Sequence, residues 1–426
     1  MRHIAGGRHT YLFFLGNIGE GPITILKRIM TGVGALIVIA AGAAATADEA
    51  GVPAPFQGDD PTSTLSIRYD DLSAILKAVV LETGRSDRSR APRARPAAAS
   101  RIIRASNSHY SLEGNRIMFT VLEQDRNLAV LTAVRKSLEA VPDSLPLKLL
   151  SRDEQLAYWL NLYNVTVLEQ ITTIYPETRL KRHYVGDQSL WDRKLLTVAG
   201  MPLSLNDIHH KILVPKYENP LVMYGLFQGF AGGPNIRSEA YEGGRVMAQL
   251  AQNAEEFVNS NRGMHRRDRL MKVSHLYEVN RDLFPNWDAD LRRHLRRYAD
   301  GVYQDRIKSA SRFAPSITNY AIADIHNGYK GRGTSVSTNP AALLGAIKSA
   351  GDDGTSAEGH FGPTSYVAND GAVFSAGVTP YLQGQSQYGG RFPIHVVEYL
   401  KTIEERRRTN KEGEVSIEEY DESPPE

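Results

Sequence analysis

The 426-residue chain contains no cysteine. This absence excludes disulfide bonds, zinc sites built from thiolates and cysteine nucleophiles. It does not identify a compartment, because exported proteins without disulfides are common. Any catalytic or binding chemistry of this chain therefore has to use other side chains.

A strong net charge is also missing. The formal net charge is +2, and the first 47 residues carry four basic residues against one acidic residue. The remainder is therefore close to −1, so we expect no general affinity for nucleic acid. Hydrophobic residues make up 42% of the chain and charged residues 23%, which is ordinary for a protein with a packed core.

Common catalytic and metal-binding motifs are absent from the sequence. There is no H-E-x-x-H pattern, and no histidine pair has the spacing of metal ligands. The stretch "GYKGRGTS" at 328–335 lacks the spacing of a phosphate loop and follows no apolar strand. The stretch "GQSQYG" at 384–389 is one residue too long for a G-x-S-x-G elbow. We expect neither a metal nor a cofactor.

The N-terminus predicts export. Lys27 and Arg28 precede an apolar run, and Ala45-Thr46-Ala47 fits a signal-peptidase cleavage site. We predict a periplasmic or secreted protein cleaved after Ala47, and residues 1–26 are interpreted as a misplaced start. The alternative is a membrane anchor formed by residues 29–47, which are about long enough to span a bilayer.

Composition divides the rest of the chain into a linker, a domain and a tail. Residues 48–65 are rich in Pro, Gly and Asp, residues 66–327 carry helical and apolar patterns, and residues 328–426 form a low-complexity tail that we expect to be disordered. Within the domain, seven arginines lie between Arg85 and Arg104. This stretch predicts a solvated loop, and a weak contact with an anionic surface is the alternative.

The clearest local signal is the stretch from Ser151 to Pro176. Ser151 and Glu154 fit a capping box, a broad apolar stripe follows, and Pro176 ends the helix. Asn161 and Asn164 share one face of this buried helix. Their amides either hold a neighbouring strand or loop, or orient a histidine or a substrate carbonyl.

Other patterns complete an α+β prediction. The sequence predicts further helices near 244–260, 275–284 and 287–303, a short strand at 270–273, and a strand at Leu221–Phe230 that is packed on both faces. We therefore expect a mostly helical single domain around a small β-sheet, with Leu221–Phe230 as its central strand.

The helix also carries a family resemblance. Residues 158–164 read YWLNLYN, which is similar to the F/Y-W-x-N-L-Y-N signature of domain-of-unknown-function family 547, found in bacteria and plants. The blocks "SLWDRK" (189–194), "LSLNDIHH" (203–210) and "KVSHLYEVNRDLF" (272–284) follow in the family's order. The resemblance covers roughly 66–327. It implies a papain-like or transglutaminase-like hydrolase origin.

This chain departs from the family where chemistry would be expected. Many members have a histidine followed by a cysteine-containing segment that ends in Ser-Cys-Pro. Here Tyr224 stands at the histidine position, the first cysteine position falls near Gln228 or Gly229, and Gly232-Gly233-Pro234 replaces Ser-Cys-Pro. Glycines at such a place open space for a ligand or for a closely approaching backbone.

Two functions remain open at this point. The first is a binding or scaffolding domain without catalysis, whose partners would be peptide, cell-wall or envelope components. Its candidate binding residues are Asn161, Asn164, Tyr224, Gln228, Gly232 and Gly233.

The alternative is a hydrolase or transferase acting on amide or ester bonds. His209 or His210 would be the base, Asn164 or Asp207 the orienting group, and Gln228 with backbone N–H groups the oxyanion donors.

Overall fold

The computed structural model describes residues 49, 51–89, 113–186, 189–329 and 391. The predicted signal or anchor, most of the arginine-rich loop and nearly all of the predicted tail lie outside these residues. Among the helices of the described ranges, none is both long enough and apolar enough to cross a membrane.

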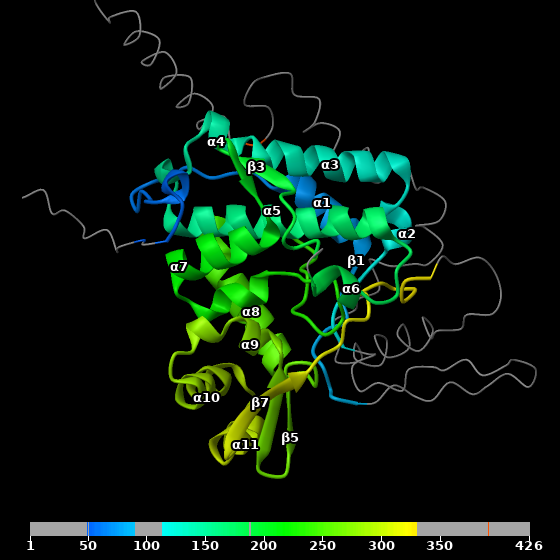
Figure 1. The fold of residues 1–426 in the computed structure, drawn as a ribbon, viewed down its shortest axis with the longest axis vertical. Coiled ribbons are helices and arrows are strands. Elements are labelled where there is room, and N and C mark those ends of the chain that lie inside the picture. Colours follow the sequence, from blue (N-terminus) through cyan, green and yellow to red (C-terminus); the bar gives the residue numbers. More distant parts are fainter. Residues whose placement is uncertain (1–48, 50, 90–112, 187–188, 330–390, 392–426) are drawn as a thin grey trace, which may run out of the picture. The chain divides into compact units, whose positions relative to one another are not determined.

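The fold is α+β, with about half of the described residues in helices and the strands in small sheets (Figure 1). The α-helices are α1 (Asp70–Val79), α2 (Phe119–Leu122), α3 (Asp125–Glu139), α4 (Val141–Ser144), α5 (Arg152–Ile174), α6 (Lys181–Tyr184), α7 (Val214–Tyr217), α8 (Val246–Val258), α9 (Leu276–Val279), α10 (Trp287–Tyr298) and α11 (Gly301–Lys308). The strands are β1 (Val80–Leu81), β2 (Arg116–Ile117), β3 (Leu196–Val198), β4 (Met201–Leu203), β5 (Met264–Arg267), β6 (Leu270–Ser274) and β7 (Arg312–Ile317).

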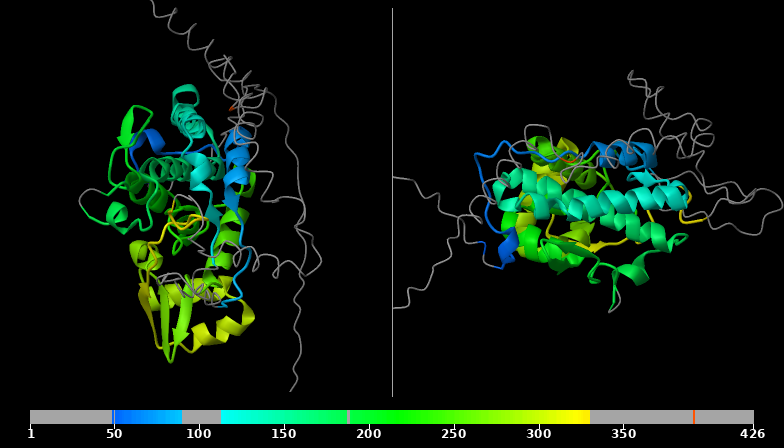
Figure 2. Two further views of the ribbon diagram at one scale, coloured as in Figure 1. Left: turned by 90° about the vertical axis from the view of Figure 1, so that its right-hand side faces the viewer. Right: turned by 90° about the horizontal axis from the view of Figure 1, so that it is seen from above.

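Helix α5 forms the centre of the core. Eighteen of its 23 residues are buried, so it is covered on all sides and not only along one stripe. Helix α3 packs along it (Figures 1 and 2), and Thr132 on α3 donates a hydrogen bond of 2.6 Å to Glu169 on α5. Trp159 meets the ring of Phe56 edge-on at 4.9 Å. The prediction of a buried helix here is confirmed.

The start of α5 uses half of the predicted capping box. The Ser151 hydroxyl accepts a hydrogen bond from the Glu154 N–H at 3.2 Å. The Glu154 carboxylate does not reach back to Ser151 but accepts from the Ile67 N–H at 2.9 Å, which joins α5 to the chain before α1. Glu154 is only 5% exposed, and this burial raises its pKa from 4.5 to about 7.

This raised pKa predicts a pH-dependent stability. The native state keeps the Glu154 proton up to about pH 7, whereas the unfolded chain releases it near 4.5. The free energy of unfolding should therefore fall as the pH rises through this window, by about 3 kcal/mol. We expect Glu154→Gln to remove this part of the slope. Urea unfolding of both proteins between pH 4 and 8 measures it, and parallel curves for the two would contradict the assignment.

The segment predicted as a linker is part of the packed domain. Val52 and Phe56 are buried, and the Nζ atom of buried Lys216 donates to the carbonyls of Phe56 at 2.7 Å and of Gly58 at 3.0 Å. The Pro- and Gly-rich composition suggested a linker, but Phe56 fills a position against Trp159 in the core.

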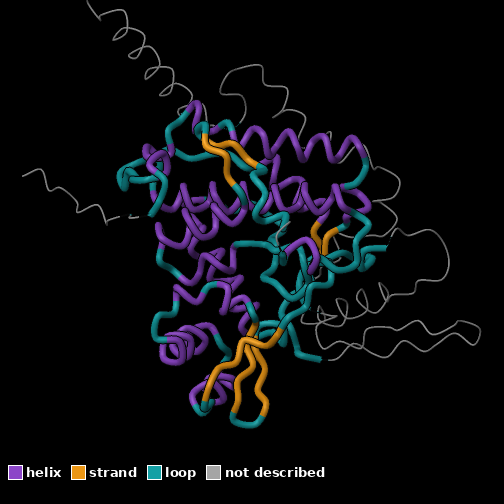
Figure 3. The backbone as a smooth tube through the Cα atoms, in the orientation of Figure 1, coloured by secondary structure: helices purple, strands orange, loops and turns teal. Residues whose placement is uncertain are grey.

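Within the described residues, the strands form three separate small sheets and not the single sheet that was expected (Figure 3). β1 and β2 pair antiparallel, as do β3 and β4. In the third sheet β6 lies between β5, which is antiparallel to it, and β7, which is parallel. Strand β6 confirms the strand predicted at 270–273, and α8 confirms the helix predicted near 244–260.

The strand predicted at Leu221–Phe230 is wrong. Residues Pro220–Gly225 form a 3-10 helix whose first turn is capped by Asn219, because its side chain accepts from the Leu221 N–H at 3.0 Å. Beyond it the chain is irregular, and Phe230 makes a single bridge to Ile322. A short apolar run looks the same in a buried strand and in a buried helical turn. Its hydrophobic periodicity therefore could not show which of the two forms here.

Candidate functional site

Residues Met223–Arg237, here called the glycine segment, run through the protein without regular structure over most of their length. Every residue from Met223 to Ile236 is buried. Backbone N–H and C=O groups that leave water need hydrogen-bond partners. The side chains of Asn115, Asn164 and Asn253 supply several of them, and Asn161 binds the nearby backbone of Tyr241 in the same way. We call these four residues the asparagine clamp.

The two asparagines of the α5 signature each hold a piece of backbone with both ends of the amide. Asn164 donates to the Gly225 carbonyl at 2.9 Å and accepts from the Phe227 N–H at 3.0 Å. Asn161 donates to the Tyr241 carbonyl at 2.8 Å and accepts from the Tyr241 N–H at 2.9 Å. Their spacing on one helix face therefore fixes two separate pieces of irregular chain.

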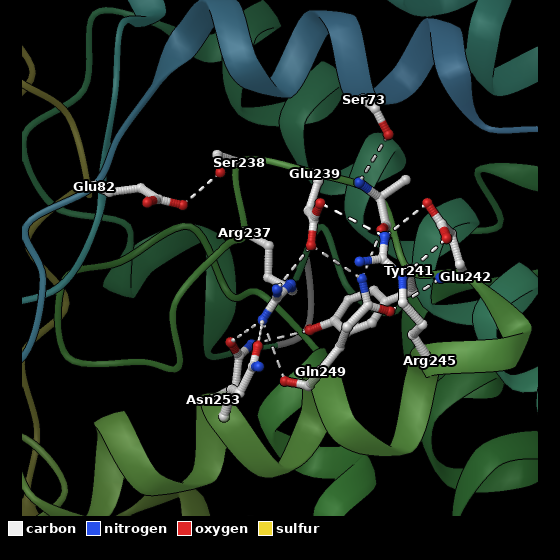
Figure 4. A network of polar contacts seen from close by, with 12 residues as sticks. Ser73, Glu82, Arg237, Ser238, Glu239, Tyr241, Glu242, Arg245, Gln249 and Asn253 are labelled. Atoms are coloured by element: carbon white, nitrogen blue, oxygen red, sulfur yellow. Dashed lines mark hydrogen bonds and ion pairs between the residues drawn. The ribbon is translucent and has the colours of Figure 1, made fainter. Parts of the chain in front are cut away.

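Asn253 on α8 joins these two pieces. Its amide nitrogen lies 3.0 Å from the Tyr224 carbonyl, 3.3 Å from the Asn235 carbonyl and 2.9 Å from the Tyr241 hydroxyl. Figure 4 shows it in the polar network where the chain from Arg237 to Arg245 passes between α1 and α8.

Asn115 completes the clamp, because it donates to the Ile236 carbonyl at 2.8 Å and its N–H donates to the Asn235 side chain at 2.8 Å.

The glycines let other backbone approach the segment. The Gly232 N–H donates to the Asn319 carbonyl at 3.0 Å, and a Cβ atom on Gly232 would lie only 2.6 Å from that oxygen. Gly229 has a φ of +75°, which favours glycine. A Cβ on Gly233 would lie 3.2 Å from the Gln228 side-chain oxygen. These glycines were expected to make space either for a ligand or for a closely approaching backbone. At Gly232 the space is used by the backbone of Asn319.

A surface pocket opens beside the glycine segment, with an empty volume of about 300 Å³ when its open mouth is included. Its lining residues are Tyr184, Gln228, Phe230, Gly232, Ser274, His275, Leu276, Val279, Ile317, Thr318, Asn319 and Tyr320. Gln228 and Gly232 are the two predicted binding residues that line it. Asn161, Asn164, Tyr224 and Gly233 do not line it.

The pocket combines aromatic faces with amide, hydroxyl and imidazole side chains. The rings of Tyr184, Phe230 and Tyr320 pack together with centroids 5.1 to 6.0 Å apart. The Gln228 amide donates to the Tyr184 hydroxyl at 3.0 Å, so that hydroxyl keeps its own hydrogen for another acceptor. Burial raises the pKa of Tyr184, which keeps the phenol neutral. No Asp, Glu, Lys or Arg is among the residues that line this pocket.

Several pocket residues were not found from the sequence. Tyr184, Asn319 and Tyr320 lie in stretches without a recognisable motif, and His275 belongs to no histidine pair with the spacing of metal ligands. The block "KVSHLYEVNRDLF" did contain Ser274 and His275, but nothing in it indicated that they would face Gln228, which lies 46 residues earlier in the chain.

The comparison with known families gives one match. Residues 147–258 match the family described as "Protein of unknown function, DUF547". The match confirms the resemblance drawn from residues 158–164, and it contains α5, the glycine segment and α8. No curated protein and no solved structure matches the chain.

His209 lies within the DUF547 match and is buried in a π-helix, Asp207–Leu213. Its Nε2 atom lies 2.7 Å from the side-chain oxygen of Asn280, whose amide nitrogen donates to the Leu276 carbonyl at 2.9 Å. The His209 ring therefore carries its hydrogen on Nε2. Burial lowers its pKa to about 3, which keeps the ring neutral at physiological pH. The His210 ring stacks on it at 4.0 Å.

Asp207 does not orient either histidine. Its carboxylate accepts from the Ser204 N–H at 2.7 Å and forms ion pairs with Lys194 and Lys211. Although burial opposes the shift, these partners lower the pKa of Asp207.

The side chain that contacts His209 is instead Asn280, which follows the last residue of α9. The helix predicted at 275–284 is therefore shorter than expected. Helix α9 ends at Val279 and a separate 3-10 turn, Arg281–Leu283, follows.

Tyr224, which the resemblance predicts at the position of a family histidine, is fully buried in an aromatic cluster. Its hydroxyl lies 3.1 Å from that of Tyr277 and 2.8 Å from Nε2 of His294. The Asn164 amide engages only backbone groups in the hydrogen bonds of the described residues, so these bonds do not join it to His209 or His210. Within the same residues, no group of three or more His, Asp or Glu side chains is arranged to hold a metal ion.

Proposed function

We propose that this protein is an exported, non-catalytic binding domain whose pocket accepts an uncharged ligand. The observation that carries the proposal is the lining of the pocket, where three aromatic rings lie beside amide and hydroxyl side chains and His275, and no carboxylate, ammonium or guanidinium group is present. A charged ligand would lose its hydration there without gaining a partner of opposite sign.

The free hydrogen-bonding groups of the pocket favour a ligand with amides and hydroxyls. The Tyr184 hydroxyl can donate and the Gln228 side-chain oxygen can accept, since the Gln228 nitrogen is already bound to Tyr184. The faces of Phe230 and Tyr320 offer apolar contact. Neutral segments of cell-wall fragments, which combine acetamido sugars and peptide amides, present these groups together.

Hydrolysis by a His-Asn set is the alternative, and the contacts support it less. Asn164 spends both amide atoms on backbone, and His209 is buried against Asn280. Ser274 and His275 line the pocket, but the Ser274 hydroxyl oxygen accepts from the Leu276 N–H at 3.2 Å, as in a turn.

We expect Gln228→Leu to weaken ligand binding about tenfold, because it removes the pocket's amide and leaves the Tyr184 hydroxyl without its donor. The probe is a set of soluble, uncharged peptidoglycan fragments, and the measurement is isothermal titration calorimetry on the purified protein. Gln170→Leu, a half-buried site on α5 outside the pocket, is the matched control.

Equal affinities for the two variants, or no binding by the wild type at millimolar ligand, would contradict the pocket as the binding site. Steady release of product from an amide or ester substrate, abolished in His210→Ala, would favour the hydrolase alternative over the binding domain.

A further inference from the structure

Arg391 is inserted into the domain although it lies 62 residues beyond the last preceding residue that the structure describes. Its guanidinium lies between α1 and α3 with only 8% of the side chain exposed. Asp71, on the first turn of α1, faces it with 4% of its side chain exposed. A charged pair this deeply buried is stable only if its remaining hydrogen-bonding groups are also satisfied.

All five N–H groups of this guanidinium have an acceptor. The two terminal nitrogens bind the two carboxylate oxygens of Asp71 at 2.6 and 2.5 Å, in the two-pronged geometry that suits arginine. The other donors reach the Arg68 carbonyl at 3.1 Å, the Val134 carbonyl at 3.4 Å and the Ser137 hydroxyl at 2.6 Å. We call these four acceptor residues the arginine socket.

The backbone of Arg391 is recognised as well. Its carbonyl accepts from the Arg68 N–H at 2.5 Å, while its guanidinium donates to the Arg68 carbonyl. The contact thus combines one main-chain and five side-chain hydrogen bonds at a single residue. Lysine would keep the charge, but it has three donors on one atom and could not reach this set of acceptors.

We propose that the arginine socket is a docking site that fastens the chain's own C-terminal region to the domain through Arg391. The occupant is the same chain, because Arg391 fills every acceptor in the socket and its backbone is bound there too. With Arg391 removed, Asp71 would be a buried carboxylate without its guanidinium, so the socket requires an arginine for its own stability.

Limited proteolysis of the full chain tests this docking. Trypsin needs the arginine side chain in its own specificity pocket, so Arg391 has to leave the socket before the following bond is cut. We expect Asp71→Asn to speed cleavage after Arg391 at least tenfold, with cleavage after exposed Arg193 as the internal standard. Asp70→Asn is the matched control, because the neighbouring Asp70 is half-exposed and pairs with Arg68 at the surface.

A second measurement remains informative if Asp71→Asn does not fold. In Arg391→Lys, hydrogen exchange at the Arg68 amide should rise at least tenfold, because this amide loses the Arg391 carbonyl when the residue leaves. Equal cleavage rates in Asp71→Asn and Asp70→Asn, or unchanged exchange at Arg68, would overturn the proposal. Protection that disappears on hundredfold dilution would show a second copy as the occupant and overturn it too.

Discussion

Arg262→Met is expected to lower the free energy of unfolding by about 4 kcal/mol, because it removes one partner of a buried ion pair. The Arg262 side chain is 1% exposed and pairs with Glu256. It also donates to the Gly233 carbonyl at 2.7 Å, in the turn next to the pocket. Burial already raises the pKa of Glu256. Methionine matches the length of the side chain but leaves this carboxyl group and the Gly233 carbonyl without their donor.

Urea unfolding measures the loss, with Arg293→Met as the control. Arg293 also pairs with a carboxylate, Asp290, but its side chain is 77% exposed, so we expect a change below about 0.5 kcal/mol. Adding Glu256→Gln to Arg262→Met should recover part of the loss, since the amide has no charge to bury. A loss of less than about 1 kcal/mol in Arg262→Met would mean that the pair and the Gly233 contact contribute little.

Gly243→Ala is expected to destabilise the protein by about 3 kcal/mol, through a clash at the start of α5. A Cβ atom on Gly243 would lie 2.1 Å from a carboxylate oxygen of Glu154 and 2.8 Å from its Cα atom. The carboxylate can rotate away, but the Cα atom belongs to the helix backbone. Helix α5 or the chain at Gly243 therefore has to shift.

The neighbouring glycine provides the control for this substitution. A Cβ on Gly244 would have no atom within 4 Å, so Gly244→Ala should change stability by less than about 1 kcal/mol. Thermal unfolding of the two variants side by side measures the difference. Similar melting temperatures for the two variants would show that α5 accommodates a methyl group at Gly243 without a shift of its backbone, and would contradict the expected clash.

The sequence predicted the helices better than the strands. Helix α5 was predicted because its apolar residues recur over many turns between Ser151 and Pro176, and α8 for the same reason. Residues Leu221–Phe230, which overlap the glycine segment, were predicted as a strand because a short apolar run does not distinguish a strand from a buried irregular chain. The real partners of this segment, the asparagine amides, come from elements far away in the sequence, so their pairing depends on tertiary structure.

The site was predicted only in part. Gln228 and Gly232 were singled out because they stand where the resemblance expects cysteine chemistry, and both line the pocket. Tyr184 and Tyr320 reach the same pocket from stretches on either side of the glycine segment. Single aromatic residues carry no signal of their own in a sequence, and only the folded chain brings these rings to Gln228.

The asparagine clamp fixes the path of the main chain in the glycine segment independently of the side chain that faces the pocket. Its amides hold the main chain at Tyr224, Gly225, Phe227, Asn235 and Ile236, and they do so without touching the side chain of Gln228. Exchanging that side chain therefore leaves the supporting bonds in place. The course of the main chain and the groups that it presents to the pocket are therefore set by different residues, so a substitution at Gln228 changes what the pocket can bind without changing how the segment is held.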